Sequence, residues 1–474
     1  MDAQKNTTMF IYEILMGLII ILCPFISSVQ KMNSFGGLGT EGNFIPAVIA
    51  VILWLFCCLF LHEKILLPQA KSFWLLCAFM SYLLISGVLH IEDLLFMQYQ
   101  GVHAYSRYFV QLGSMIFYFL LALFAYNFFY KYQNKYVEII QTCIYLSFTL
   151  AGGYSLIEIL SLIGHSNARD LLIVIDSLFR GNELNFYYRL RSLTAEASYL
   201  GMYIGFVLPW ILSGFFQYNT KRRYLFLILF VYISLMCIMT MSRTGYVAYI
   251  IEILVWGYLF AEDLIKEKFA IAVSVILFFV VIVGSSEFFE QWEEYASLDM
   301  LEILTSLLQW EGAHNVSNIS RYGSQIAALS MFCDFPFCGV GFGMFGFHAV
   351  DYYPAWAWES YEIARWWGVN SVVDPAWPPS HGLYARILGE TGICGFILWG
   401  VMLLHLWKEA TTSVRACVDR REKIFCRNCL LSFLAVIMSG FNVDAFRILF
   451  MWIVYAMIWM NFSRIKKRLP VSVR

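Results

Sequence analysis

The chain has 474 residues, of which 60% are hydrophobic, 18% aromatic and only 14% charged. A soluble protein would carry roughly a quarter charged residues, so this composition excludes an ordinary soluble domain and indicates a protein embedded in lipid. The formal net charge of −1 gives no overall bias toward nucleic acid.

Apolar runs along the chain predict membrane spans, each of which needs about 20 mostly apolar residues. Twelve such runs occur, at 9–28, 44–62, 73–90, 108–130, 138–163, 197–217, 223–241, 244–261, 269–285, 383–407, 428–442 and 446–463. We therefore expect an all-α polytopic membrane protein of about 12 transmembrane helices that forms a single membrane domain over 1–474. The last two runs are short and would tilt or form a tight hairpin. No internal repeat relates the two halves, which weakens the alternative of a 12-helix transporter.

The basic residues predict which side each loop faces. If both termini lie inside, the inner segments hold 21 of the 32 lysines and arginines, and every inner loop is basic. The outer side then carries one lysine and otherwise arginines, whose fixed fork of donors suits phosphate. An anionic ligand on the outer face is one explanation. The other explanation is that the arginine side chains snorkel to lipid phosphates, and we favour it for Arg107, Arg169 and Arg180.

Two outer segments are long, 164–196 and 286–382, and the second lies between the ninth and tenth spans. Loops of this size usually carry function. The second contains an amphipathic stretch at 320–335, a glycine-rich GVGFG segment that predicts a flexible turn, and a tryptophan-rich segment. Cys333 and Cys338 lie close together in this loop, and the sequence leaves open whether they pair.

Charged residues gather at the outer ends of two spans and at the start of the amphipathic stretch. In RLRSLTAEASYLG, Arg191 and Glu196 either cap a helix start as a pair or form an outward-facing anion site. In TMSRTGYVAY, a turn of only a few residues would hold Arg243 rigidly near the membrane surface, and simple snorkelling is the alternative. Arg321 begins the amphipathic helix of the large loop.

The stretch SHGLYARILGE opens the tenth span with three titratable groups. Ser380 is a suitable helix cap, and Arg386 and Glu390 are spaced i, i+4 on one face, where they can pair. His381 has no local partner at the outer tip, where a histidine can act as a general base near neutral pH. The alternative is an ordinary interfacial histidine.

The tryptophan-rich segment precedes this stretch and includes Trp366 and Trp367. Aromatic faces of this kind stack on sugar rings, but they also populate the interfacial belt of membrane proteins, which is their commoner use. The outer segments contain no DxD pair and no Cys/His spacing that would predict a metal site.

The motifs EASYLG, SRTG, SR…P…GVGFG and SHGLYARILGETGICG, in this order over roughly 190–400, resemble the O-antigen polymerase and ligase superfamily of bacterial inner membranes. Ala197 departs from the proline that is usual in the first motif. The resemblance implies a GT-C-like fold with a large periplasmic loop, both termini in the cytoplasm, and a glycosyltransferase that needs no metal or cofactor. The donor would be a sugar chain linked to undecaprenyl pyrophosphate.

Carried over by motif, His381 would activate the acceptor hydroxyl, and Arg243 and Arg321 would hold the pyrophosphate, with Arg191 beside them. Supporting or acceptor-binding roles fall to Glu196, Arg386, Glu390, Trp366 and Trp367. Within the superfamily the acceptor decides the activity. A polymerase joins the chain to another lipid-linked repeat unit, which we favour, and a ligase joins it to the lipid A core. The partners expected are lipid-linked oligosaccharides, membrane lipids and a polysaccharide chain-length regulator, and no nucleic acid.

Overall fold

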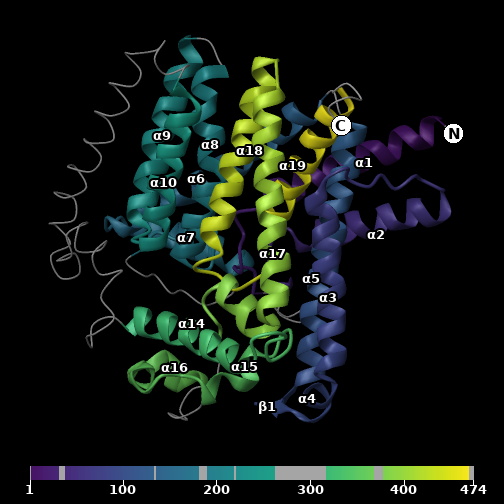
Figure 1. Ribbon diagram of the computed structural model, residues 1–474. Helices are drawn as coiled ribbons and strands as arrows, with labels where there is room; N and C mark the ends of the chain where they lie inside the picture. Colours follow the sequence, from purple (N-terminus) through teal and green to yellow (C-terminus); the bar gives the residue numbers. More distant parts are fainter. Residues whose placement is uncertain are drawn as a thin grey trace.

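The computed structural model describes residues 2–30, 38–132, 135–180, 189–217, 220–261, 316–367 and 377–468. Apart from one short hairpin, its regular elements are helices (Figure 1). In chain order they are α1 (Asp2–Ile21), α2 (Phe44–Phe60), α3 (Lys71–Leu89), α4 (Ile91–Phe96), β1 (Gln98–Tyr99), β2 (Val102–His103), α5 (Ala104–Lys131), α6 (Tyr136–Leu162), α7 (Ser166–Phe179), α8 (Ala197–Gln217), α9 (Thr220–Met239), α10 (Arg243–Leu259), α14 (Val316–Asp334), α15 (Phe345–His348), η2 (Ala349–Asp351), η3 (Ala355–Glu359), α16 (Tyr361–Trp366), α17 (Leu383–Ala416), α18 (Arg420–Ser439) and α19 (Leu449–Arg468).

Eleven of the twelve expected spans fall on helices of the described part of the chain, and the twelfth, 269–285, lies outside the described residues. Six of these helices are long and apolar enough to cross a membrane, namely α3, α5, α6, α8, α17 and the 221–239 part of α9. Two shorter apolar helices, 8–21 and 44–60, accompany them. The expected class of a polytopic, all-helical membrane protein is therefore supported.

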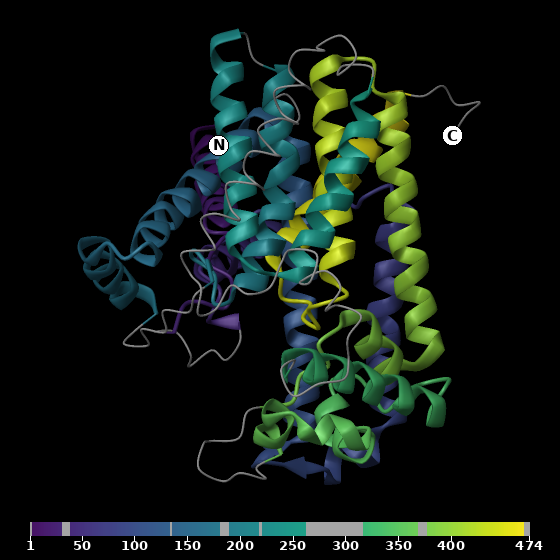
Figure 2. The same cartoon turned by 90° about the vertical axis from the view of Figure 1, so that its left-hand side faces the viewer.

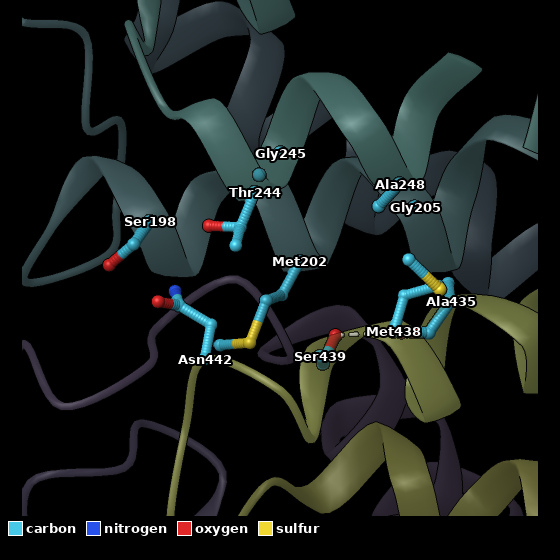
Figure 3. A pocket seen from close by; sticks show the side chains of 11 residues that line it. Ser198, Met202, Gly205, Thr244, Gly245, Ala248, Ala435, Met438, Ser439 and Asn442 are labelled. Atoms are coloured by element: carbon cyan, nitrogen blue, oxygen red, sulfur yellow. Dashed lines mark hydrogen bonds between the residues drawn. The ribbon is translucent and has the colours of Figure 1, made fainter. Parts of the chain in front are cut away.

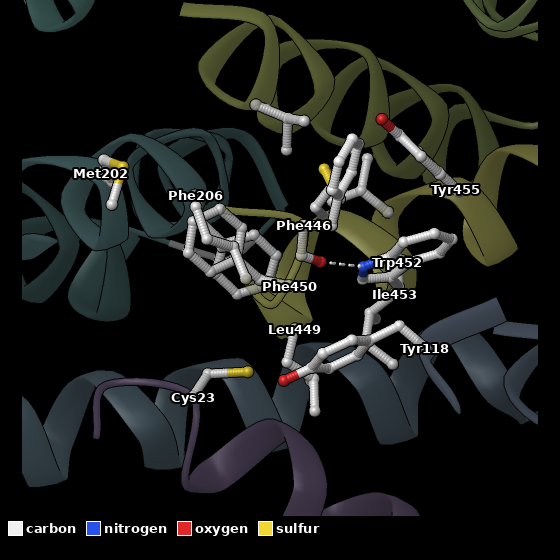
Figure 4. Packing of buried hydrophobic residues seen from close by; sticks show 14 of the residues in the cluster. Cys23, Tyr118, Met202, Phe206, Phe446, Leu449, Phe450, Trp452, Ile453 and Tyr455 are labelled. Atoms are coloured by element: carbon white, nitrogen blue, oxygen red, sulfur yellow. Dashed lines mark hydrogen bonds between the residues drawn. The ribbon is translucent and has the colours of Figure 1, made fainter. Parts of the chain in front are cut away.

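The core lies around α8, α18 and α19, which are surrounded by the other long helices. Trp452 on α19 is fully buried, stacks on Tyr118 of α5 and donates a 2.7 Å hydrogen bond from its indole N–H to the carbonyl oxygen of Phe446 (Figure 4). Phe206 of α8 stacks on Phe450 in the same cluster. Helix α8 is apolar all round, and a helix of this kind belongs in the interior of a bundle.

Helix α17 is broken at Gly392, whose φ of 61° lies in the left-handed region. The segment 336–341 fills the break, because Val340 N–H donates to Gly389 O at 3.0 Å and Gly341 N–H donates to Glu390 O at 2.9 Å. On the other side, Ile393 N–H donates to Pro336 O at 2.8 Å. The glycine-rich segment is thus a fixed clamp on α17 rather than the flexible turn that its composition suggested. A helix break leaves backbone groups that need partners, and this clamp supplies them.

The described part of the large loop gathers at one end of the bundle. Figures 1 and 2 show α14, α15 and α16 beside α4 and the β1–β2 hairpin, at the end away from the C-terminus of α19. The expected amphipathic stretch 320–335 falls on α14 except for its last residue, and α14 packs along α17 and against η3 and α16. This arrangement brings the start of α17, with His381, against the large loop.

Candidate active site at the start of helix α17

The turn 440–448 between α18 and α19 connects the candidate site residues. Asn442 accepts a hydrogen bond from a guanidinium N–H of Arg321 through its side-chain oxygen. The carbonyl oxygen of Asp444 accepts from Arg386 Nη1 at 2.7 Å, and Arg447 donates from Nη2 to Ser27 Oγ at 3.1 Å. Two side chains and one backbone carbonyl of one short turn therefore contact three different parts of the molecule.

His381 lies directly before α17 in a left-handed conformation, with φ at 53°. Its carbonyl oxygen accepts a 2.9 Å hydrogen bond from Gln325 Nε2 of α14. Its imidazole ring lies 5.4 Å from the ring of Trp366, between ring centroids, and its Nε2 is buried and has no hydrogen-bond partner among the described residues. A non-glycine residue with positive φ indicates local strain, which the surrounding contacts have to hold in place.

Burial and, to a smaller extent, the nearby Arg321 lower the pKa of His381 to about 4, against the opposite effect of Asp444. The imidazole is therefore neutral at neutral pH, which is the form that accepts a proton. Burial alone would raise the pKa of Asp444, but Arg386 and His381 outweigh it, so that its pKa lies below the ordinary value. Asp444 stays an anion beside the histidine.

Arg321 occupies the second turn of α14 and connects two parts of the site. Beyond its hydrogen bond to Asn442, it lies close enough to His381 to act on its charge. Gln325, one turn further along α14, donates to both His381 O and Phe441 O. The helix α14 is therefore anchored to the start of α17 and to the turn 440–448 at once.

Arg243 is the first residue of α10, and the turn that connects it to α9 is only three residues long, as expected. Ser242 caps the helix by accepting from Gly245 N–H through its hydroxyl. Arg243 Nη1 donates a 2.7 Å hydrogen bond to Asn318 Oδ1 of α14, which draws it toward Arg321. Close packing depends on glycine here, since a Cβ on Gly201 would lie 3.2 Å from the Cα of Gly245.

A narrow cleft between α8, α10 and α18 lies beside these arginines, and its volume is about 10 Å³. Figure 3 shows Ser198, Thr244 and Asn442 at one end of it and Gly205, Ala248 and Ala435 at the other. Helices α8 and α10 both begin near its polar end. Helix N-termini carry unpaired N–H groups and a positive dipole, so this end favours an anion.

The structure confirms the expected pair on α17, with Arg386 Nε 3.1 Å from Glu390 Oε2 and both side chains buried. The second carboxylate oxygen of Glu390 accepts from Phe345 N–H at 3.2 Å. Arg386 also bonds to the Asp444 carbonyl. These two residues tie the first half of α17 to the clamp and to the turn 440–448, and so position His381 without pointing toward the cleft.

Arg191 lies in a different cluster from Arg243 and Arg321. Its Nη2 is 3.6 Å from Asp176 Oδ2, and burial is the main cause that lowers the pKa of its guanidinium. Arg180, expected to snorkel toward lipid, is instead 3% exposed and bonds to Asp176 at 3.2 Å. That expectation was wrong because Asp176, one turn earlier on α7, supplies a carboxylate inside the protein.

Arg180 orders the segment 190–196, which leads into α8. Arg180 Nη2 donates to the carbonyl oxygens of Ser192 and Thr194. Glu196 is exposed enough to reach solvent and accepts from Ser198 Oγ at 3.2 Å, at the edge of the cleft. Two residues of the motif RLRSLTAEASYLG were expected to be functional. Glu196 adjoins the cleft, whereas Arg191 supports the segment that carries Glu196.

Trp366 and Trp367 pack inward against the β1–β2 hairpin. The carbonyl of Trp366 accepts from Tyr99 Oη at 2.9 Å and from Gln100 Nε2 at 2.7 Å, and Trp367 packs on the Tyr99 ring with centroids 4.7 Å apart. Trp366 is 7% exposed. It therefore shields the His381 imidazole rather than presenting an open stacking surface.

Sequence reasoning did not single out Asn442, Asp444 or Gln325. The only available signal was FNVDAFR, in which an asparagine, an aspartate and an arginine interrupt two apolar runs. Polar groups in such a position are costly near lipid and indicate function or pairing. Among the described residues no group of three or more His, Cys, Asp or Glu could hold a metal ion, and Cys333 and Cys338 are both free thiols.

Comparison with known proteins supports the resemblance seen in the motifs. Residues 228–400 match the family model Wzy_C, which is described as O-antigen ligase. The match includes Arg243, Arg321, His381, Arg386 and Glu390, whereas Asp444 lies beyond it. No curated protein matches the chain.

Proposed function

We propose, from this match to the O-antigen ligase family, that the chain polymerises lipid-linked polysaccharide repeat units in the bacterial inner membrane. It would transfer a growing glycan from undecaprenyl pyrophosphate to a hydroxyl group of another lipid-linked repeat unit. The family implies a membrane glycosyltransferase-like enzyme of polysaccharide biosynthesis, and the match does not support a transporter. The choice of polymerase follows from the resemblance of the EAS element and the tryptophan-rich loop.

In the proposed reaction, His381 takes the proton from the acceptor hydroxyl. The acceptor oxygen forms a bond to C1 of the donor sugar as the bond from C1 to the phosphate oxygen breaks, with inversion at C1. Pyrophosphate on the lipid carrier leaves as an anion, and Arg243 and Arg321 neutralise its developing charge. Interactions of this kind, in a site with little water, typically contribute a few kcal/mol each to transition-state stabilisation.

One observation carries this proposal. A neutral histidine with an unpartnered, buried Nε2 lies within the electrostatic range of Arg321, and Arg321 donates to Asn442 at the edge of a cleft at the starts of α8 and α10. A base and an anion-binding group are thus adjacent. Trp366 would have to move from the imidazole when the acceptor binds, and release of its carbonyl from Tyr99 and Gln100 is the motion required.

A ligase is the second candidate, because O-antigen ligase is the description of the family that matches. The same base and arginines would serve, and the acceptor would be the lipid A core instead of a lipid-linked repeat. In either case the partners would be membrane lipids and lipid-linked oligosaccharides. For the polymerase we also expect a chain-length regulator.

The experiment is complementation of a strain that lacks this protein, read by electrophoresis of its surface polysaccharide. We expect the wild-type chain to restore long polymers, and His381→Ala to leave single repeat units although the protein reaches the membrane. Arg243→Ala and Arg321→Ala should do the same. Arg169→Ala, an exposed outer arginine on α7, serves as the matched control and should behave as wild type.

Two outcomes would change the proposal. Long polysaccharide from the His381→Ala strain would remove the histidine from the chemistry. Polymer that accumulates on the lipid carrier in the deletion strain, without transfer to lipid A core, would identify the ligase instead.

A further inference from the structure

Arg107 lies in the first turn of α5 and has no acidic partner of its own. Its guanidinium carbon is 4.5 Å from the ring centroid of Trp377, and among the described residues no oxygen accepts a hydrogen bond from it. The side chain is partly buried. Stacking on an aromatic face leaves the N–H edge of a guanidinium free to bind an anion.

The surroundings make this position unfavourable for a cation. The first turn of a helix carries the positive end of the dipole, which disfavours a positive charge. Arg386 and Arg447 are also close enough to repel Arg107. A cation kept at such a place without a carboxylate bonded to it indicates a ligand that supplies the negative charge.

The neighbouring charges are already engaged with one another. Glu390 accepts from Arg386 and from Phe345 N–H, one with each carboxylate oxygen. Arg447 has its Nε 3.9 Å from Glu41 and donates from Nη2 to a serine hydroxyl. The carboxylates of Glu390 and Glu41 therefore bind other residues. Glu390 and Asp444 nevertheless lie within electrostatic range of Arg107.

Arg107 also belongs to a different arginine cluster from the one assigned to the donor. Arg243 and Arg321 act on each other and on Arg189. Arg107 instead has Arg386 and Arg447 as its cationic neighbours. His381 connects the two clusters, since Arg321 and Asp444 both act on its charge, and Asp444 also acts on Arg107.

We propose that Arg107, stacked on Trp377, binds a phosphate group of the second lipid-linked substrate, the acceptor of the proposed reaction. The inference rests on the proposed function, because only a transfer between two lipid-linked chains needs two pyrophosphate sites. It revises the expectation that Arg107 snorkels to lipid phosphates. Snorkelling would point the side chain away from the protein, whereas this one faces Trp377 and the charged groups around Asp444.

The test measures binding rather than turnover. The probe is farnesyl pyrophosphate, titrated by calorimetry into the full-length protein in phosphatidylcholine nanodiscs, with farnesol as the uncharged control. Wild type should bind two equivalents of farnesyl pyrophosphate and no farnesol. Arg107→Ala should bind one, with the affinity of the remaining site unchanged within about threefold. Arg243→Ala should lose the other equivalent.

Control variants separate recognition from folding. Arg107→Lys keeps the charge but not the planar fork, and should weaken the second equivalent roughly tenfold. Trp377→Leu should weaken the same equivalent, and Arg169→Ala should retain both. Each variant is first checked for a single symmetric peak in size-exclusion chromatography. Full stoichiometry in folded Arg107→Ala would overturn the inference.

The remaining outcomes identify the chemical group that binds at Arg107. They also show whether the second site alone, or the proposed function as a whole, is contradicted. Competition by glucuronate at the Arg107-dependent site, without competition by methylenediphosphonate, would assign a sugar carboxylate in place of the phosphate. Failure of wild type to bind any farnesyl pyrophosphate would contradict the proposed function itself. A single Arg243-dependent equivalent in wild type would overturn only the second site.

Discussion

The carboxylate of Asp444 accepts hydrogen bonds from both the backbone N–H and the hydroxyl group of Ser380, at 2.8 and 3.2 Å. Ser380 directly precedes His381, so an acid on the turn between the last two helices fixes the start of α17. The same acid also acts electrostatically on the imidazole. Asp444 is thus placed both to position the proposed base and to stabilise the positive charge that it gains during transfer.

Asp444→Asn and Asp444→Ala separate these two contributions. Both hydrogen bonds reach one oxygen, which the asparagine amide can reproduce, so Asp444→Asn should fold as wild type but lose the charge. We expect its transfer rate to fall by roughly 10- to 100-fold with little change in thermal stability, because the imidazolium loses its counter-charge. Asp444→Ala should also lower the melting temperature. Equal rates for wild type and Asp444→Asn would show that the charge has no role.

The pH dependence of transfer reports the pKa of His381. Burial and Arg321 lower this pKa to about 4 from the ordinary 6.5. The proton-accepting neutral form therefore persists as pH falls, and is lost only below a pH of about 4. We expect a nearly constant rate of transfer between pH of about 8 and about 5.5 in nanodiscs. A loss of activity centred near 6.5 would contradict a buried, neutral base.

The break in α17 predicts different effects for two glycine substitutions in one helix. A Cβ on Gly392 would lie 2.4 Å from the carbonyl carbon and oxygen of Phe337, and its φ is positive. Gly392→Ala should therefore cost about 1–3 kcal/mol or more of folding free energy and displace the clamp. Gly400→Ala is the matched control, because nothing lies within 4 Å of its Cβ position. Equal melting temperatures for the two variants would show that the clamp is not rigid.

Substitutions around Asp176 test whether Arg191 supports the fold or binds substrate. Arg180 bonds to Asp176 and to two carbonyl oxygens, so Arg180→Ala should destabilise the protein by about 3–5 kcal/mol. Arg191→Ala removes only a 3.6 Å contact and should cost less. Thermal melting in detergent measures both. A large loss of polymer in Arg191→Ala at unchanged stability would instead support its expected role at the pyrophosphate.

Substituting Arg321 by lysine tests the need for a planar guanidinium beside His381. Arg321 can donate to Asn442 and to a phosphate at the same time, whereas an ammonium group is a single point charge. We expect Arg321→Lys to retain the fold and to lower transfer by roughly tenfold or more. Full-length polysaccharide in a strain that carries Arg321→Lys would show that charge alone is sufficient.

The parts of the site that could be predicted are local along the chain. The Arg386–Glu390 pair follows from i, i+4 spacing, and the three-residue turn before Arg243 follows from the distance between two apolar runs. The amphipathic stretch of the large loop likewise appears as α14. Each of these depends on neighbours within a few residues, which periodicity and capping rules describe well.

Contacts between distant segments could not be predicted in the same way. GVGFG has the composition of a flexible turn, yet it is fixed by hydrogen bonds to a helix some fifty residues later. Arg180 and Arg107 carried the same expectation, snorkelling to lipid phosphates, but one bonds to Asp176 and the other stacks on Trp377. Hydropathy does not distinguish them.

The sequence by itself determined that this is a helical, multi-pass membrane protein, because the cost of placing polar groups in lipid acts on every residue in turn. Only the tertiary structure decided that Asp444 meets Ser380, that Asn442 holds Arg321, and that Arg107 faces inward. The physical reason is that lipid is as apolar as the helices are, so hydropathy places each helix in the membrane but does not choose its neighbours.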